Sequence, residues 1–254
     1  MISAAHNVWV LGNGFLGSRL AEACRRLGAR VLCIDATTPA EVHGDAADET
    51  VLRAAACQVA PTLIFCCLST RGQMERYEHT YLHPLRLLQR MFPTAEIVFC
   101  SSLSAGWGSS PSADILRQAE QLVLQRGGRV ARLAALYGPG RCELLRRHLA
   151  GEPCLFGEDT RLLHYLHVED AVQALLLLCS APPGTCAEVV GETFTKGNIY
   201  ACLAAWTGVP VARENASPSR RGGAALPEGA ACCPVPGWKP RHFFRAFVQQ
   251  EVQQ

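Results

Sequence analysis

The stretch VWVLGNGFLG, from Val8 to Gly17, decides the fold of this chain. An apolar run of strand-forming residues breaks into a Gly-x-Gly-x-x-Gly turn at Gly12, Gly14 and Gly17, and helix-forming residues follow from 18 to 27. Strand, tight turn and helix in this order present backbone N–H groups at a helix N-terminus, where dinucleotide sites hold the pyrophosphate. The stretch therefore predicts a dinucleotide-binding site.

An acidic residue stands where such a site needs one. A second apolar strand, expected over 29–34, ends at Asp35, which lies 18 residues beyond Gly17. At about this spacing a carboxylate accepts hydrogen bonds from the adenosine ribose, and it would repel a 2′-phosphate, so we expect NAD rather than NADP. Alternatively, Asp35 only opens the turn that Ala-Thr-Thr-Pro continues.

The composition is that of a globular chain without extreme charge. Of its 254 residues 49% are hydrophobic and 18% are charged, the net charge is +2, and no long basic or acidic block occurs. We therefore expect neither nucleic acid nor a membrane as a partner. The 13 cysteines lack the paired spacing of a disulfide framework, and many lie inside apolar runs. They are typical of a reducing compartment, so we expect a cytoplasmic protein.

Metal-binding patterns are weak in this sequence. No Cys-x-x-Cys occurs. His164 and His167 are three residues apart on an expected strand, where alternate side chains point to opposite faces. We therefore expect no metal site.

Strand and helix patterns alternate from the first strand to about position 140. The expected strands are Val8–Leu11, 29–34, a short one at 42, 61–68, 95–100 and 129–136, and the expected helices are 18–27, 49–57, 73–91 and 113–125. Asp48 is the expected N-cap of the second helix, and Pro84 should kink or restart the third. Such alternation favours an α/β fold, a Rossmann-type doubly wound parallel sheet covered by helices on both faces.

The remaining chain is less regular. We expect helices at 143–150, 169–179, 196–206 and 241–252, strands at 162–166 and 187–190, and a surface loop at 213–238. The length fits one domain, 1–254, with a dinucleotide-binding core at 1–140. Residues 141–254 would complete the sheet and form a small substrate-side subdomain.

Four motifs in register resemble the extended short-chain dehydrogenase/reductases, which include nucleotide-sugar epimerases and dehydratases. They are GNGFLG at 12–17, FCSSLSAGWG at 99–108, LYGPGR at 136–141 and LHVEDAVQALLLL at 166–178. The glycine pattern and the short length are most similar to small, atypical bacterial members of the YeeZ type. The resemblance implies the same Rossmann fold and a bound dinucleotide, with a small molecule or a nucleotide sugar as substrate.

The resemblance also implies roles for individual residues. The glycine turn would hold the pyrophosphate, Asp35 the ribose, Asp45 with Ala46 the adenine, and the segment after the fourth strand the nicotinamide ribose. His167 and Asp170 would frame the substrate side, although Asp170 could instead be only a helix N-cap. The implied cofactor-binding residues are Gly12, Asn13, Gly14, Phe15, Leu16, Gly17, Asp35, Asp45, Ala46, Cys67, Leu68, Ser69, Ser101 and Tyr137.

The catalytic residues of the family have no counterparts in this sequence. Its active members use a Ser or Thr hydroxyl together with Tyr-x-x-x-Lys, in which the tyrosine exchanges a proton and the lysine lowers its pKa. None of the five tyrosines is followed four positions later by a lysine. Ungapped matching places Leu103, Ser112 and Leu116 at the three catalytic positions, and Arg117 is the nearest cation.

Two classes of function therefore stay open. The chain is either an NAD-dependent oxidoreductase, epimerase or dehydratase with unusual acid and base residues, or a non-catalytic NAD-binding protein with a regulatory or redox-sensing role. The candidates for proton transfer or oxygen polarisation are Ser102, Ser104, Tyr137, Tyr165 and His167. We expect a monomer or a homodimer.

Overall fold

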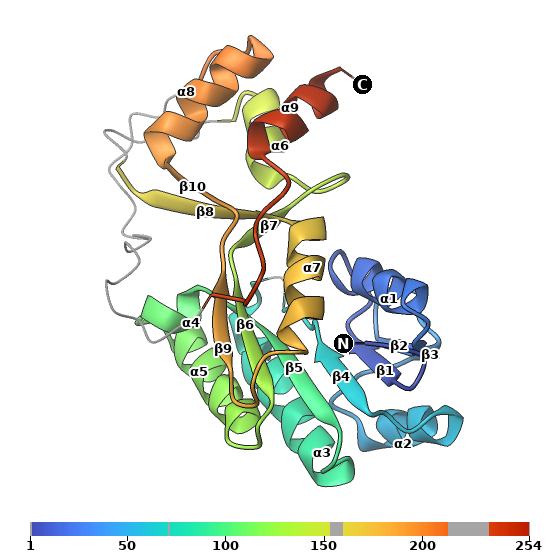
Figure 1. The fold of residues 1–254 in the computed structure, drawn as a ribbon. Helices are drawn as coiled ribbons and strands as arrows, with labels where there is room; N and C mark the ends of the chain where they lie inside the picture. The colour runs from blue at the N-terminus through green and yellow to red at the C-terminus, as the bar shows by residue number, and fades with distance from the viewer. Residues whose placement is uncertain (1, 71, 153–159, 213–233, 254) are drawn as a thin grey trace. The chain divides into compact units, whose positions relative to one another are not determined.

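A computed structural model describes residues 2–70, 72–152, 160–212 and 234–253 (Figure 1). The chain divides into two compact units. The first unit comprises Met1–Leu133, Val172–Val189 and Ala231–Trp238, and the second comprises Ala134–Ala171, Val190–Ala230 and Lys239–Gln254. The chain leaves the first unit after Leu133 and returns to it from Val172 to Val189.

The first unit contains the predicted parallel sheet. Its strands are β1 (Asn7–Leu11), β2 (Arg30–Asp35), β3 (Val42–His43), β4 (Leu63–Cys66), β5 (Glu96–Ser102), β6 (Arg129–Leu133) and β9 (Cys186–Val189). They lie in the order β3-β2-β1-β4-β5-β6-β9, and every neighbouring pair is parallel. This order reverses direction at β1 and β4, whose carboxyl ends are where open α/β sheets bind ligands. The predicted Rossmann-type fold is confirmed.

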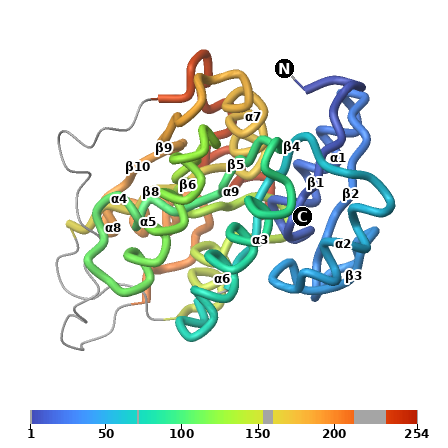
Figure 2. The backbone as a smooth tube through the Cα atoms, turned by 90° about the horizontal axis from the view of Figure 1, so that it is seen from below, coloured from blue at the N-terminus to red at the C-terminus, as the bar shows by residue number. Residues whose placement is uncertain are grey.

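Helices cover both faces of this sheet (Figure 2). The hydrophobic core on one face joins the strands to α2 (Glu49–Gln58), α3 (His83–Met91) and α5 (Pro111–Leu124). The helix α1 (Gly17–Arg26) packs on β1 and β2, and α7 (Val168–Leu178) lies on the same side as α1. Side chains such as Trp9, Ile64 and Phe65 are fully buried, as expected for strands enclosed on both faces.

Local sequence signals explain where these helices begin. The carboxylate of Asp48 accepts a hydrogen bond from the Thr50 N–H at 2.8 Å, so the predicted N-cap of α2 is confirmed. Ser110 caps α5 in the same way through the Ala113 N–H.

The helix predicted over 73–91 is broken as the proline suggested. It consists of a 3₁₀ turn at η1 (Met74–Arg76), a π-helical turn at η2 (Glu78–Leu82) and then α3, with Pro84 in its first turn. Proline fits the first turn of a helix, but its ring disturbs the preceding turn, which explains the wider η2 geometry.

One predicted strand is divided between the two units. The residues expected as a single strand over 129–136 form β6 in the first unit and β7 (Ala135–Tyr137) in the second. The strand β7 belongs to a separate sheet of order β10-β8-β7, together with β8 (Leu162–His167) and β10 (Glu192–Thr195). The sequence did not show the division, because both halves contain strand-forming residues and no Gly or Pro separates them.

The second unit has its own hydrophobic core. Helices α6 (Glu143–Leu149), α8 (Lys196–Thr207) and α9 (Phe244–Val252) contribute to it, with Tyr137 from β7. Its buried residues include Leu145, Ile199, Leu203 and Phe247. The loop predicted over 213–238 falls mostly outside the described residues.

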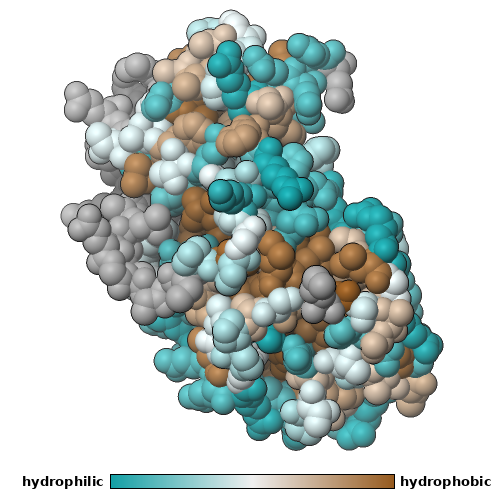
Figure 3. All heavy atoms as spheres, in the orientation of Figure 1, coloured by the Kyte–Doolittle hydropathy of each residue, from teal (hydrophilic) through white to brown (hydrophobic). Residues whose placement is uncertain are grey.

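The helix α7 begins in the second unit and continues in the first from Val172. Leu177 on this helix is 40% exposed, and Figure 3 shows hydrophobic residues at the surface there. None of the helices in the described ranges combines the length and the apolar character that crossing a membrane requires.

Candidate functional site

Two of the three glycines in the turn after β1 are required by packing. A side chain on Gly12 would place its Cβ 2.7 Å from the carbonyl oxygen of Cys67, and the φ of Gly12 is +91°. A Cβ on Gly17 would lie 1.8 Å from the carbonyl oxygen of Gly12. The first glycine thus makes the tight turn against the end of β4, and the last allows α1 to approach that turn.

Gly14 differs from its two neighbours. A Cβ on Gly14 would meet no heavy atom within 4 Å, and its φ lies outside the left-handed region. Nothing in the ligand-free protein therefore requires glycine at this position. Open space in front of a turn at a helix N-terminus leaves room for a close anionic ligand.

Asp35 at the end of β2 is hydrogen-bonded to the glycine turn. Its Oδ2 accepts the Asn13 N–H at 2.7 Å, and its Oδ1 accepts the Thr37 and Thr38 N–H groups at 2.6 and 2.8 Å. Burial tends to raise the pKa of this carboxyl, but the three backbone N–H donors outweigh burial and hold the pKa below its usual value. Asp35 therefore both opens the turn after β2 and supports the glycine turn, and its role toward the ribose stays a prediction.

The segment after β3 carries the residues expected near the adenine. Asp45 accepts the Ala47 N–H at 2.9 Å, and its other oxygen lies 2.7 Å from Nε2 of His79 in η2. Ala46 is buried. The pKa of Asp45 is lowered because these partners outweigh its burial. The sequence analysis did not find His79.

The predicted nicotinamide-side residues lie beyond the end of β4. The Cys67 N–H donates to the carbonyl oxygen of Leu11, so this segment runs directly beside the glycine turn. Leu68 is half-buried and Ser69 is exposed. Ser101, on the neighbouring strand β5, is buried, and its hydroxyl donates to Glu120 at 2.6 Å. Any contact of Ser101 with a cofactor therefore stays a prediction.

The two candidate serines lie at the end of β5 and in the short helix α4 (Ser104–Trp107). Ser102 Oγ accepts from the Ser104 N–H at 3.3 Å and from its hydroxyl at 3.1 Å. Leu103 between them is buried. The structure therefore brings the two hydroxyls together at the end of a sheet strand.

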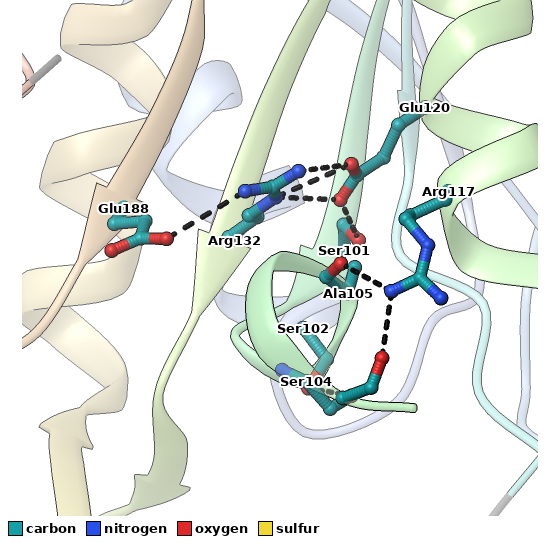
Figure 4. A network of polar contacts seen from close by, with 9 residues as sticks. Ser101, Ser102, Ser104, Ala105, Arg117, Glu120, Arg132 and Glu188 are labelled. Atoms are coloured by element: carbon teal, nitrogen blue, oxygen red, sulfur yellow. Dashed lines mark hydrogen bonds and ion pairs between the residues drawn. The ribbon is translucent and has the colours of Figure 1, made fainter. Parts of the chain in front are cut away.

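Arg117 from α5 is bound to the same loop. Its Nη1 donates to the carbonyl oxygens of Ala105 and Gly108 at 2.9 and 2.8 Å, and its Nη2 contacts Asp114 (Figure 4). This guanidinium anchors α4 to α5.

A buried ionic network lies behind this loop (Figure 4). Arg132 on β6 donates to both carboxylate oxygens of Glu120 on α5 at 2.7 to 3.2 Å, and lies 3.7 Å from Glu188 on β9. A Cβ on Gly106 would lie 2.9 Å from Arg132 Nη1, so α4 packs closely on the network. Sequence reasoning missed this arrangement because its charged residues come from three separate elements.

The second unit places Tyr137 in an aromatic cluster. The ring is 2% exposed and meets His167, Phe244 and Phe247 edge-on, with centroids 4.8 to 5.3 Å away. Burial raises the pKa of the Tyr137 phenol, and burial does the same for the neighbouring Tyr165. Neither phenol is therefore suited to releasing a proton near neutral pH.

His167 forms part of a stacked histidine pair in the same unit. Its ring lies parallel to that of His242, with centroids 4.2 Å apart, and its Nδ1 accepts the Glu169 N–H at 3.3 Å. His242 Nδ1 lies 2.8 Å from the buried carboxylate of Asp170, which also accepts the backbone N–H groups of Arg241 and His242. Asp170 is the third residue of α7, so it is not the N-cap of that helix, and it anchors the segment before α9.

His242 was not among the sequence candidates. A carboxylate bound to Nδ1 fixes which imidazole nitrogen carries the proton and leaves Nε2 as an acceptor, the arrangement of a general base. No local pattern marks His242, because its partner is 72 residues away in the sequence. Among the described residues, no group of three or more His, Cys, Asp or Glu side chains could hold a metal ion.

Comparisons with known proteins identify the fold. A scan of protein-family models gives no match, and neither does a search of curated proteins. Solved structures match over nearly the whole chain. MoeE5 in complex with UDP-glucose and NAD is 23% identical over 97% of both chains, with a TM-score of 0.78.

Two further matches have the same architecture. The dTDP-glucose 4,6-dehydratase of Bacillus anthracis in complex with NAD is 17% identical, with 98% of this chain and 96% of that chain covered and a TM-score of 0.76. The UDP-glucose 4-epimerase of Thermus thermophilus, in complex with NAD, is 20% identical, with 97% and 98% covered and a TM-score of 0.75. The chain therefore has the Rossmann-type fold of NAD-bound nucleotide-sugar epimerases and dehydratases.

Proposed function

We propose that the first unit binds NAD at the glycine turn between β1 and α1, and that the chain is an atypical member of the extended short-chain dehydrogenase/reductases. The openness of Gly14 carries this proposal. Packing explains Gly12 and Gly17, whereas no neighbouring atom requires glycine at position 14, and a ligand held against the backbone would supply the missing reason. Three similar structures were solved with NAD, which supports the choice of ligand.

The substitution Gly14→Val tests this proposal. Its side chain would occupy the space in front of the turn, so NAD binding should fall at least about 100-fold. The melting temperature of the ligand-free variant should stay close to that of the wild type, because no neighbour obstructs the new Cβ. Calorimetric titration with NAD and thermal unfolding measure the two effects.

Gly12→Ala is the matched control for this experiment. It should destabilise the protein even without ligand, because its Cβ would collide with Cys67. Unchanged NAD affinity in a folded Gly14→Val variant would contradict the proposed site.

In the catalytic alternative, the chemistry would be proton and hydride transfer on a small molecule or nucleotide sugar, with acid and base residues other than Tyr and Lys. In the first unit, Ser102 and Ser104 are the candidates for polarising a substrate oxygen. In the second unit, the candidates for proton exchange are imidazoles. His167 remains a candidate. Its stacked neighbour His242 has the better geometry for a base, because Asp170 orients its Nδ1.

A non-catalytic NAD-binding role is the second candidate function. The burial of Leu103 and Leu116 at two positions that the family uses for catalysis supports it. The burial of Tyr137 supports it as well. In this role the bound dinucleotide would stabilise the fold or report the redox state to a partner.

Turnover distinguishes the two functions. We expect no conversion of UDP-glucose or dTDP-glucose at rates near the 1 s⁻¹ or more that is typical of enzymes. Chromatography of the sugar nucleotides measures epimerisation and dehydration, which form no net NADH, and absorbance at 340 nm measures net oxidation. Turnover at such rates would reject the non-catalytic role. Turnover that survives both Ser102→Ala and His242→Ala would reject these residues as the acting groups.

A further inference from the structure

Two cysteine thiols lie side by side next to the glycine turn. The Sγ atoms of Cys67 and Cys100 are 3.5 Å apart. Cys100 lies on β5, and Cys67 follows the last residue of β4, so extending the register Cys66↔Phe99 by one position places them opposite each other. Both residues are half-buried and neither is in a disulfide.

This geometry satisfies the main requirement for a disulfide. Neighbouring strands lie about 4.8 Å apart, which is within the range of Cα separations that disulfides span. Partners in a parallel register direct their side chains to the same face of the sheet. Closing the bond requires the two sulfurs to approach by about 1.5 Å, to a length of about 2.05 Å.

Movement of Cys67 would be transmitted to the glycine turn. The carbonyl oxygen and carbon of Cys67 lie 2.7 and 2.9 Å from the position that a Cβ on Gly12 would occupy, so the two backbones are in close contact. The Cys67 N–H also donates to Leu11, the residue before Gly12, at 2.8 Å. Any shift that draws Cys67 toward β5 therefore changes the backbone on which the turn rests.

We propose that Cys67 and Cys100 form an oxidisable dithiol whose closure to a disulfide lowers the affinity of the glycine turn for the dinucleotide. The effect on affinity rests on the proposed NAD site, whereas formation of the disulfide does not. The oxidant is a peroxide. This thiol–disulfide switch would make the amount of bound dinucleotide depend on the redox state of the surroundings.

The chemistry balances with one peroxide for each pair. One cysteine thiolate attacks a peroxide oxygen, which gives a sulfenic acid and releases the first water. The second thiol then attacks the sulfenic sulfur, the S–S bond forms, and the second water leaves. Two thiols lose two hydrogens, and hydrogen peroxide is reduced to two waters. A reductant such as dithiothreitol reverses the result by thiol–disulfide exchange.

The environment of the pair affects how fast it reacts. The contact with Cys100, followed by burial, raises the pKa of the Cys67 thiol. Since the thiolate is the reactive form, oxidation should become faster as the pH is raised above neutral.

The test treats the full chain with hydrogen peroxide and follows two quantities. Peptide mapping should show residues 54–71 joined to residues 91–117 with a loss of about 2 Da. Calorimetric titration should show that NAD affinity falls at least about tenfold and recovers with dithiothreitol. In a buffer of reduced and oxidised dithiothreitol, saturating NAD should lower the fraction of protein that is crosslinked at equilibrium, since the coupling between NAD binding and disulfide formation is reciprocal.

Two variants serve as controls. Cys100→Ser removes the pair and should bind NAD like the reduced wild type, with or without peroxide. Cys66→Ala should keep the response, because Cys66 belongs to the hydrophobic core on the opposite face of the sheet. It also removes the adjacent thiol from the same peptide.

The outcomes separate this proposal from the proposed function. Absence of the 67–100 crosslink would overturn the dithiol, and a crosslink with unchanged NAD affinity would overturn the switch. If the reduced protein does not bind NAD, the proposed function fails and the switch fails with it, but the crosslink is still measured by mass.

Discussion

At the scale of single residues, Asp35 at the tip of β2 supports two turns, and this structural role is compatible with the proposed one toward the ribose. Asp35 accepts backbone N–H groups from the glycine turn and from its own turn. The sequence analysis treated these as competing roles, but a carboxylate has lone pairs for several partners. The same group can therefore support the turn and repel a 2′-phosphate.

The resulting prediction concerns cofactor selectivity. The wild type should bind NAD at least about tenfold more tightly than NADP. Asp35→Asn removes the negative charge and also replaces one of the two accepting oxygens by an NH₂ group. The affinity for both dinucleotides should therefore fall, and the preference for NAD should shrink to a few-fold. Titrations of both variants with both dinucleotides measure this ratio. Equal or tighter NADP binding by the wild type would contradict the proposed ribose role of Asp35.

At the scale of elements, the buried network joins one helix to two strands. Glu120 is 3% exposed, and Arg132 connects it to Glu188 on the edge strand β9. A buried ion pair adds little compared with an apolar replacement, but losing one partner leaves an uncompensated charge. We therefore expect the largest loss of stability when one charged residue of the network is removed and its partner stays in place.

Glu120→Ala should accordingly lower the free energy of unfolding by about 3–5 kcal/mol, measured by urea denaturation. Replacing all three charged residues, in Glu120→Leu with Arg132→Met and Glu188→Gln, should cost less than the single change because no charge of the network is left unpaired. The exposed pair of Glu49 and Arg53 on α2 is the control, and Arg53→Ala should leave stability unchanged within error. A triple variant less stable than Glu120→Ala would contradict this account.

A second prediction at this scale concerns pH and the packing of α6 on α8. His148 on α6 is 3% exposed, its Nε2 lies 2.9 Å from Thr207 Oγ1 at the end of α8, and burial lowers its pKa below 6.5. The unfolded chain then binds the proton more tightly than the folded one. The neutral His148 ring therefore contributes fully to the free energy of unfolding above about pH 6.5. This contribution is lost as the pH falls through the pKa of the folded state.

Acid should therefore destabilise the second unit as the pH falls below about 6.5, and His148→Gln should flatten this dependence. Unfolding followed at Trp206 on α8, with the other tryptophans replaced by Phe, would report on this unit. An unchanged pH profile in the variant would show that other groups cause the dependence.

At the scale of the whole molecule, the two units have separate cores, and the proposed NAD site lies in the first. Ligand binding stabilises the unit that holds the ligand. At 100 times the dissociation constant the gain is about 2.7 kcal/mol. We therefore expect NAD to slow hydrogen exchange of the most protected amides in β1 and β4 by about 100-fold.

Amides of α8 in the second unit provide the internal reference for this measurement. They should change much less than those of β1 and β4. Unchanged exchange in β1 and β4 at saturating NAD would show that the first unit does not bind the dinucleotide.

Much of the first unit could be predicted because its signals are local. The strand, glycine turn and helix at Val8–Gly17, the N-cap at Asp48 and the restart at Pro84 each depend on a few neighbouring residues. Such signals act through backbone conformation and short hydrogen bonds, which do not require the rest of the fold. The sequence by itself therefore determined the fold class and the position of the glycine turn.

Tertiary structure alone decided which side chains meet. It divided residues 129–136 between two sheets, paired Asp170 with His242, placed Cys67 against Cys100, and distinguished Gly14 from Gly12 and Gly17. Cys67 and Cys100 are 33 residues apart in the sequence, and Asp170 and His242 are 72 residues apart. Whether the members of each pair come into contact depends on the strand order and the packing of the folded chain. Local secondary-structure propensity does not indicate which distant residues will pair, so these contacts are seen only in the folded chain.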